Sequence, residues 1–241
     1  MTACVWDDLV GQTRVAGYLR AAVDSAAVSH AYLVTGPTGS GKTTAARALA
    51  CSLFCEDGGC GSCAACRRVR AMTHPDLHVL TPEGVAEYLI AQIRGVIHDV
   101  HLKPIEAPYK VYVFDDVGQL RAEAANAFLK TFEEAPDGSY LVLLVTSLDR
   151  LLPTIRSRGR LIRFAALPNE FVAELLRRDS QMSAADARTL ARFAEGSMER
   201  AAALARSEFL RLHREVTSAL PRLDRASALV LADAIEAWAA E

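Results

Sequence analysis

Eight consecutive residues, Gly36-Pro37-Thr38-Gly39-Ser40-Gly41-Lys42-Thr43, constrain the fold more than any other part of the sequence. They match the pattern G-x-x-x-x-G-K-[S/T], between an apolar run typical of a buried strand and a helical pattern that begins at Lys42. In such a segment the backbone N–H groups curl around phosphate oxygens, which requires positions without a Cβ atom, and the helix N-terminus adds partial positive charge. The segment predicts a strand, a phosphate-binding loop and a helix in succession.

The loop has a defined chemistry toward ATP and Mg²⁺. Lys42 is expected to neutralise the β- and γ-phosphates, and the Thr43 hydroxyl to coordinate Mg²⁺, with Thr44 as a weaker substitute. The predicted nucleotide-binding residues are Gly36, Gly39, Ser40, Gly41, Lys42, Thr43 and Thr44. Two alternatives stay open: an ordinary glycine-rich turn, and a loop that binds nucleotide without supporting hydrolysis.

Acidic and polar residues follow two further apolar runs. Asp115 and Asp116 end the run at 111–114, where Asp115 would hold Mg²⁺ and Asp116 takes the place of the glutamate that polarises water in many ATPases. Asp116 is one methylene shorter, and a misplacement of about 1 Å can cost ~100-fold in rate, so turnover is expected to be slow or absent. Thr146, or its neighbour Ser147, would orient water or contact the γ-phosphate if its strand lies beside that of Asp115. The alternative interpretation is that Asp115 and Asp116 are a solvated acidic pair that caps the next helix.

Strand-like and helix-like segments alternate along the first two thirds of the chain. Strands are expected at 31–35, 77–80, 111–114 and 140–146, and helices at 12–25, 42–54, 85–100 and 122–132. This alternation predicts an α/β parallel sheet. After Pro168 the sequence is almost uninterrupted helix-forming segments, which Gly196-Ser197 and Pro221 divide. The predicted domains are 1–166 (nucleotide-binding, with a zinc module at 51–67), 167–207 (helical lid) and 208–241 (start of a truncated helical collar).

Five of the six cysteines lie between Cys51 and Cys66, and Cys4 stands apart. The spacing Cys55-x4-Cys60-x2-Cys63-x2-Cys66, interrupted by glycines, is typical of a Zn²⁺ site with four thiolate ligands. Four thiolates leave no open coordination position, so the zinc is expected to be structural. Cys51, four residues before Cys55 on one helical face, is an alternative first ligand, and free or redox-active thiols are the alternative to metal.

The composition places limits on partners and location. A formal charge of −2 and a pI near 6.3 argue against a protein that holds nucleic acid by itself through broad phosphate neutralisation, so protein partners are expected. The opening residues lack the apolar segment of a secretory signal, and no run of about 18 apolar residues is present. A cytoplasmic protein with no membrane segment is predicted.

The order of these motifs resembles the bacterial clamp-loader branch of the AAA+ family across nearly the whole chain. The similar segments are Trp6-Asp7-Asp8-Leu9-Val10-Gly11-Gln12, His30-Ala31-Tyr32-Leu33, Asn126-Ala127-Phe128-Leu129-Lys130-Thr131-Phe132-Glu133-Glu134-Ala135-Pro136 and Thr154-Ile155-Arg156-Ser157-Arg158. The resemblance implies a P-loop AAA+ domain with an inserted zinc module and a helical lid. It also implies that Arg158 acts as an arginine finger in the ATP site of a neighbouring subunit. Gly159 stands where the family motif usually has cysteine, and Arg158 is otherwise a surface residue paired within its own domain.

Within the branch, Thr73-His74-Pro75-Asp76 and Leu151-Leu152-Pro153 are more similar to the delta-prime family than to the gamma/tau family. The resemblance implies a subunit of the DNA polymerase III holoenzyme, a transferase, with other clamp-loader subunits, the sliding clamp and primer-template DNA as partners. A gamma/tau-type ATPase and a non-hydrolysing scaffold are the alternatives, and whether the chain is itself an enzyme stays open. Arg200 falls one place after the lid arginine of the active ATPase subunits, so its role toward nucleotide stays open.

Overall fold

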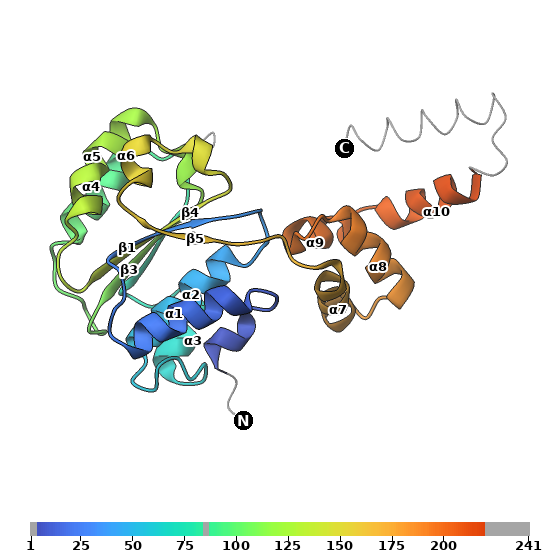
Figure 1. Cartoon of the computed structure of the whole chain (residues 1–241), viewed down its shortest axis with the longest axis horizontal. Helices are drawn as coiled ribbons and strands as arrows, with labels where there is room; N and C mark the ends of the chain where they lie inside the picture. The colour runs from blue at the N-terminus through green and yellow to red at the C-terminus, as the bar shows by residue number, and fades with distance from the viewer. Residues whose placement is uncertain (1–3, 84–86, 220–241) are drawn as a thin grey trace. The chain divides into compact units, whose positions relative to one another are not determined.

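The computed structural model describes residues 4–83 and 87–219 and divides into two compact units, Met1–Ala166 and Leu167–Glu241. The first unit is an α/β domain, and the described part of the second is all helical (Figure 1). None of the helices in the described ranges is long and apolar enough to cross a lipid bilayer. Pro221 and most of the predicted segment 208–241 lie outside the described residues, so the collar stays a prediction.

A sheet of five strands forms the centre of the first unit. Its order is β2-β3-β4-β1-β5, and every neighbouring pair is parallel. The strands are β1 (Ala31–Thr35), β2 (Leu77–Leu80), β3 (Lys110–Phe114), β4 (Ser139–Val145) and β5 (Arg160–Arg163). The predicted α/β parallel sheet is therefore confirmed. The four expected strands correspond to β1, β2, β3 and β4 with bounds that differ by no more than one residue, and β5 is a fifth strand that the sequence pattern did not predict.

Alternate residues of each strand face opposite layers of helices, because successive side chains in a strand point to opposite faces. On one face Tyr32 and Val34 pack with 3-10 helix η1 (Val5–Asp8) and helices α1 (Thr13–Asp24), α2 (Lys42–Phe54) and α3 (Ala64–Arg70). On the other, Ala31 and Leu33 pack with α4 (Ile90–Asp99), α5 (Ala122–Glu133) and α6 (Pro153–Arg156) (Figure 1). Both faces are apolar, which explains why the strands read as continuous apolar runs.

The helix expected from residue 85 begins later, at Ile90. Residues 84–86 lie outside the described residues, and Glu87 forms an isolated antiparallel bridge with Glu83. The next residue, Tyr88, is buried, and the carbonyl oxygens of Leu80 (2.9 Å) and Asp115 (2.5 Å) share its single hydroxyl proton as acceptors. These contacts hold the backbone before Ile90 extended, so the apolar spacing alone placed the helix start too early.

The second unit contains α7 (Asn169–Ser180), α8 (Ala184–Phe193), α9 (Met198–Arg206) and α10 (Phe209–Ala219). Val172, Leu176 and Leu190 are among the side chains of its buried core. Ser183 and Ser197 cap α8 and α9 by accepting backbone N–H groups, as serine commonly does at helix N-termini. The glycine-serine break in the sequence therefore corresponds to the turn between two helices.

Candidate functional site

The strand order brings three predicted segments to one edge of the sheet. The phosphate loop follows β1, Thr146 follows β4 and Asp115 follows β3, and these three parallel strands are neighbours. The N–H of Gly36 donates to the carbonyl of Val145 (3.2 Å), which ties the start of the loop to the end of β4. Thr146 was expected to act at this site only if its strand lies beside that of Asp115. The pairing of β4 with β3 meets this condition. Carboxyl ends of adjacent parallel strands are the usual ligand sites of open α/β sheets.

The loop between β1 and α2 requires glycine at two positions for different reasons. A Cβ atom on Gly36 (φ +155°) would lie 2.6 Å from both the Cβ atom and the carbonyl oxygen of Phe164. Gly41 is the N-cap of α2 with φ +100°, a left-handed conformation that other residues rarely adopt. The Ser40 hydroxyl donates to the carbonyl of Pro37 (2.7 Å) and closes the turn. The loop is therefore shaped both by the close approach of Phe164 and by its own turn contacts.

Lys42 places its ammonium group against the loop that it is expected to serve. The side chain is buried, and Nζ donates to the carbonyls of Gly36 and Pro37, each at 2.7 Å. Thr43 and Thr44 follow in the first turn of α2 and are partly exposed. A phosphate that enters the loop would replace carbonyl oxygens as acceptors for the ammonium, which favours the exchange because a charge-assisted hydrogen bond to phosphate is stronger.

The two aspartates after β3 have different surroundings. The backbone of Asp115 is fixed on both sides: its N–H donates to Leu80 (2.9 Å) and its carbonyl accepts from Tyr88. Asp116 has a left-handed backbone (φ 48°), and its Oδ2 atom accepts a hydrogen bond from Gln119 (3.1 Å). Its Oδ1 atom is buried without a hydrogen-bond partner among the residues that the structure describes. Such an atom is an available acceptor beside a predicted Mg²⁺ ligand.

Arg150 is a residue of this edge that the sequence analysis missed. Its guanidinium lies 3.5 Å from both Oδ2 of Asp116 and Oγ1 of Thr146, and so joins the residues that follow β3 and β4. Ser147, the alternative to Thr146, caps the short helix Leu148–Arg150 instead. A basic residue four positions after Thr146 was the available signal, but a single arginine in a loop has no distinctive pattern.

The four predicted metal ligands form a cluster at the other end of α2. The sulfur atoms of Cys55, Cys60, Cys63 and Cys66 all lie within 4.8 Å of one another. The Sγ atom of Cys55 is 3.7 Å from those of Cys60 and Cys63. Tetrahedral zinc with bonds of about 2.3 Å requires sulfur atoms about 3.8 Å apart, so the donor set fits Zn²⁺. We call these four residues and their connecting loops the cysteine knuckle.

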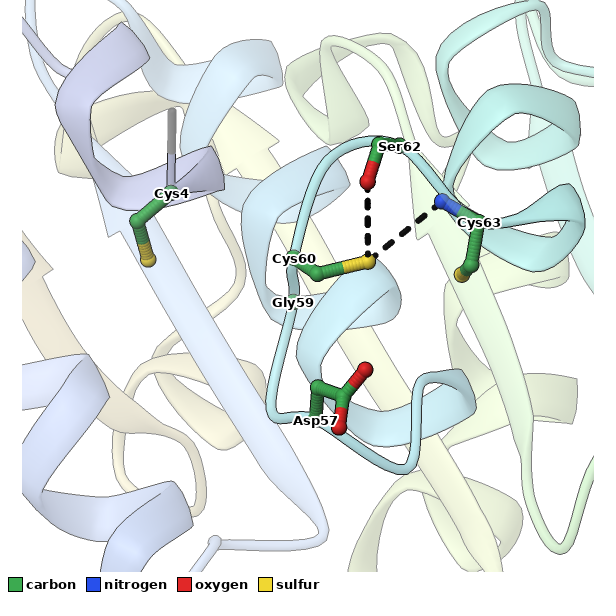
Figure 2. A pocket seen from close by; sticks show the side chains of 6 residues that line it. All are labelled: Cys4, Asp57, Gly59, Cys60, Ser62 and Cys63. Carbon is green, nitrogen blue, oxygen red and sulfur yellow. Dashed lines mark hydrogen bonds between the residues drawn. The ribbon is translucent and has the colours of Figure 1, made fainter. Parts of the chain in front are cut away.

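The other two cysteines have different places. Cys51 is buried with its thiol 3.8 Å from the carbonyl of Cys66, outside the four-sulfur cluster, and burial raises its pKa to about 11. Hydrogen bonds from the backbone and side chain of Ser62 lower the pKa of the Cys60 thiol to about 6. Cys4, which the sequence set apart, lines a pocket of about 450 Å³ together with Cys60 and Cys63 (Figure 2). The geometry thus favours Cys55 over Cys51 as first ligand.

Comparison with known proteins identifies the family. The family described as DNA polymerase III, delta subunit matches residues 11–168. The chain belongs to this family. It is 36% identical to the delta-prime subunit of DNA polymerase III from Bacillus subtilis over 168 residues, which cover 68% of this chain and 51% of that protein. It is 34% identical to the tau subunit from Escherichia coli over 206 residues, which cover 82% of this chain and 32% of that protein.

The family member described here spans about half the length, or less, of the curated relatives that it matches. Among solved structures, the RuvB Holliday junction branch migration motor of Thermotoga maritima has a similar fold, with a TM-score of 0.57 and 20% identity. The match covers 96% of this chain and 70% of that one. The predicted P-loop AAA+ fold followed by helices is therefore confirmed.

The Arg158 side chain of this family member lies at the opposite edge of the sheet from the phosphate loop. It precedes β5, which runs parallel to β1 with Tyr32 beside Arg160 and Thr35 beside Arg163. Since the loop follows Thr35, the length of β5, about 10 Å, separates the two. Arg158 pairs with Glu133, and its NH1 donates to the carbonyl of Thr154 (3.0 Å). Within its own unit the arginine therefore serves a surface contact.

The His74-Pro75-Asp76 segment has a structural role. The Asp76 carboxylate is fully buried and accepts the backbone N–H groups of Ile105 (2.6 Å), Glu106 (2.8 Å) and Ala107 (2.8 Å). Burial raises the pKa of Asp76, but these three hydrogen bonds outweigh it and leave the pKa below its ordinary value. Glu106 in turn accepts a hydrogen bond from Arg68 of α3 (2.9 Å). Asp76 thus connects the sheet to the helix of the cysteine knuckle.

Arg200 belongs to the helical unit. It lies in α9, and its NH1 donates to the carboxylate of Glu195 (2.9 Å). The side chain is exposed, and this pair stays within the second unit. Its role toward nucleotide stays an open prediction.

Proposed function

We propose that this chain is a delta-prime-like subunit of the bacterial replicative clamp loader. It binds ATP with Mg²⁺ and works in a hetero-oligomeric ring with other clamp-loader subunits in the cytoplasm. The ring opens a sliding clamp and loads it onto primer-template DNA. The observation that carries this proposal is the edge formed by the ends of β1, β4 and β3, in a chain of the DNA polymerase III family.

Three groups at this edge are suited to hold the nucleotide. The backbone N–H groups from Gly36 to Thr43 surround the phosphates, and Lys42 neutralises them. The hydroxyl of Thr43 and the carboxylate of Asp115 bind Mg²⁺. Support comes from the close approach of Gly36 to Phe164, which only glycine allows, and from the position of the Lys42 ammonium at the loop.

Hydrolysis depends on how Asp116 is used. A catalytic carboxylate must reach the attacking water, but the Asp116 side chain is one methylene shorter than that of glutamate. Its Oδ2 atom also accepts a hydrogen bond from Gln119 and lies close to the Arg150 guanidinium. These contacts favour a second candidate function, a subunit that binds nucleotide without turning it over. In that case the ring uses ATP bound here to order the subunit, and hydrolysis occurs elsewhere.

Arg158 is proposed to act on a neighbouring subunit. Its place at the far end of the strands from its own phosphate loop supports a role in trans, since a guanidinium stabilises charge on a transferring phosphoryl group only in contact with it. The partner would displace Glu133 from the guanidinium. The cysteine knuckle is proposed to hold a structural Zn²⁺ through Cys55, Cys60, Cys63 and Cys66, which supplies folding energy.

ATP binding and ATP turnover by the purified chain, alone and mixed with the other loader subunits, test the proposal. We expect Mg²⁺-dependent binding by the chain alone and hydrolysis chiefly in the mixture. Turnover of the mixture should fall when Arg158 is replaced by alanine, while the matched variant Arg156→Ala leaves it unchanged. No affinity for any nucleoside triphosphate would overturn the nucleotide-binding part of the proposal.

A further inference from the structure

The N-terminal residues touch the cysteine knuckle directly. The N–H of Val5 donates to the carbonyl of Gly59 (3.1 Å), in the loop between the first two cysteines. Gly59 has φ +98°, and a Cβ atom there would lie 2.6 Å from Cγ2 of Val5 and 2.7 Å from Oγ of Ser52. Asp8 pairs with Arg70 of α3 (2.6 Å). The segment is therefore fitted closely against the knuckle.

The same segment reaches the phosphate loop seven residues later. Gln12 is buried, with 5% of its surface exposed, and its Nε2 atom donates to the carbonyls of Ser40 (3.2 Å) and Ala165 (2.8 Å). Leu9 lies beside the next loop residue, since its Cδ2 atom is 3.9 Å from where a Cβ atom of Gly41 would be. One buried amide thus connects the phosphate loop to the chain that follows β5.

Between these two contacts the segment is anchored in the core. Val5, Trp6 and Leu9 are buried in the same apolar cluster as two knuckle cysteines, Cys55 and Cys66. The N–H of Leu9 donates to Trp6, and that of Gln12 donates to Leu9, each at 3.2 Å. Closely packed residues therefore join the knuckle loop at one end to Gln12 at the other, and close-packed interiors are able to transmit strain.

We propose that Gln12 is a positioning residue for the phosphate loop, and that residues 5–12 couple Zn²⁺ binding at the cysteine knuckle to nucleotide binding. This inference rests on the proposed function. Zinc fixes the Gly59 loop, which holds Val5 and so keeps Gln12 on the Ser40 carbonyl. Without zinc a smaller fraction of chains has the loop in its binding geometry, and the apparent affinity for nucleotide falls with that fraction. By linkage, nucleotide must tighten zinc binding by the same factor.

The dissociation constant of a non-hydrolysable ATP analogue with Mg²⁺ tests the coupling in zinc-loaded and chelator-stripped chains. Removing zinc is expected to raise this constant about fivefold or more in the wild type, the lower end of ordinary coupling factors. Gln12→Glu keeps the length of the side chain but removes its N–H donors. It should bind nucleotide more weakly when zinc-loaded, with a zinc effect reduced toward onefold. The exposed neighbour provides the matched control, Thr13→Ala, which should behave as the wild type.

A second experiment keeps zinc in place, in case stripped protein unfolds. Gly59→Ala should push Val5 away from the knuckle while all four cysteines remain, with one zinc per chain. If residues 5–12 carry the coupling, Gly59→Ala and Gln12→Glu should weaken nucleotide binding less in combination than the product of their separate factors.

Independent factors in this double-mutant cycle would overturn the coupling, as would equal dissociation constants with and without zinc in folded protein. Those results would leave the proposed function standing. Failure of the zinc-loaded wild type to bind nucleotide would instead overturn the proposed function.

Discussion

The two ends of α2 carry candidate sites of opposite construction. At its N-terminus Gly41 and Lys42 offer backbone N–H groups and one ammonium, and immediately after its C-terminus Cys55 begins a cluster of four sulfur atoms. A helix of 13 residues separates the two by about 20 Å. One end is therefore built for a diffusible anion, and the other for a resident cation.

The difference lies in how much of each geometry exists before the ligand binds. In the cysteine knuckle the four sulfur atoms already lie within 4.8 Å of one another, and that of Cys55 is 3.7 Å from two of the others, close to the spacing that tetrahedral zinc requires. In the phosphate loop, Lys42 binds carbonyls of its own loop, so nucleotide must exchange partners as it enters. We expect changes at the knuckle to alter folding stability, and changes at the loop to alter binding.

Replacing a knuckle ligand should have the largest effect. Cys66→Ser is expected to abolish stoichiometric zinc and to lower the free energy of unfolding by more than about 3 kcal/mol, because loss of a metal is among the most destabilising changes. Metal analysis and urea unfolding measure the two quantities. Cys51→Ser is the matched control, since this thiol is equally buried but outside the cluster, and it should retain one zinc per chain. Zinc lost from Cys51→Ser but kept by Cys66→Ser would reverse the assignment of the ligands.

The buried carboxylate behind the knuckle should come next. Asp76→Asn is expected to lower the free energy of unfolding by about 2–3 kcal/mol at pH 7, because the charged acceptor of three N–H groups is lost. Since the pKa of Asp76 is lowered by folding, its contribution is complete above about pH 4 and is lost as the pH falls through the folded pKa. The difference between wild type and Asp76→Asn should therefore shrink below about pH 4.

Urea unfolding at several pH values measures that difference. Asp137→Asn, at an exposed loop position, provides a control for the loss of one carboxylate and should follow the wild type. A gap between wild type and Asp76→Asn that grows in acid would contradict the proposed role of the ionised carboxylate. It would also mean that the Asp76 carboxylate does not stabilise the knuckle side of the domain, which would weaken the contrast between the two ends of α2.

The same contrast explains what the sequence could predict. Local sequence patterns predict the phosphate loop from Gly36 to Thr43 and the cluster of four cysteines, because each site is formed by a short continuous segment. The alternation of apolar runs predicted four of the five strands, and it did not predict β5, a short strand with exposed arginines at both ends. The predicted start of α4 at residue 85 was wrong. The helix begins at Ile90, because the burial of Tyr88 against the ends of β2 and β3 holds the backbone before Ile90 extended.

Contacts between distant segments had no local signal. Arg150 reaches Asp116 across 34 positions of the sequence, and Gln12 reaches Ala165 across 153. Cys4 lines the pocket beside Cys60, although their separation in sequence set Cys4 apart. Such pairs depend on the strand order and on where η1 docks, which periodicity does not determine.

At the phosphate end, Lys42→Ala should raise the dissociation constant for ATP with Mg²⁺ about 10- to 100-fold, the value of losing a hydrogen bond to a charged group. Stability should change less than at the knuckle, because the Ser40 hydroxyl still closes the turn, although the carbonyls of Gly36 and Pro37 lose their hydrogen bonds to the ammonium. Equilibrium binding and urea unfolding measure the two effects, with the exposed Lys103→Ala as a control for charge. A large loss of stability in Lys42→Ala would remove the distinction between the two ends of α2.

The smallest effect is expected at Arg158, on the edge of the sheet remote from both the loop and its ligand. Arg158→Ala removes an ion pair with Glu133 between side chains about two fifths exposed, and such pairs contribute about 0–1 kcal/mol. In the isolated chain, both the free energy of unfolding and the ATP dissociation constant should stay close to the wild-type values. Glu133→Ala should match it if the pair is only a surface contact. If the isolated Arg158→Ala chain loses nucleotide affinity, this arginine acts on its own phosphate loop. That result would contradict its place before β5, at the opposite end of the strands from the loop.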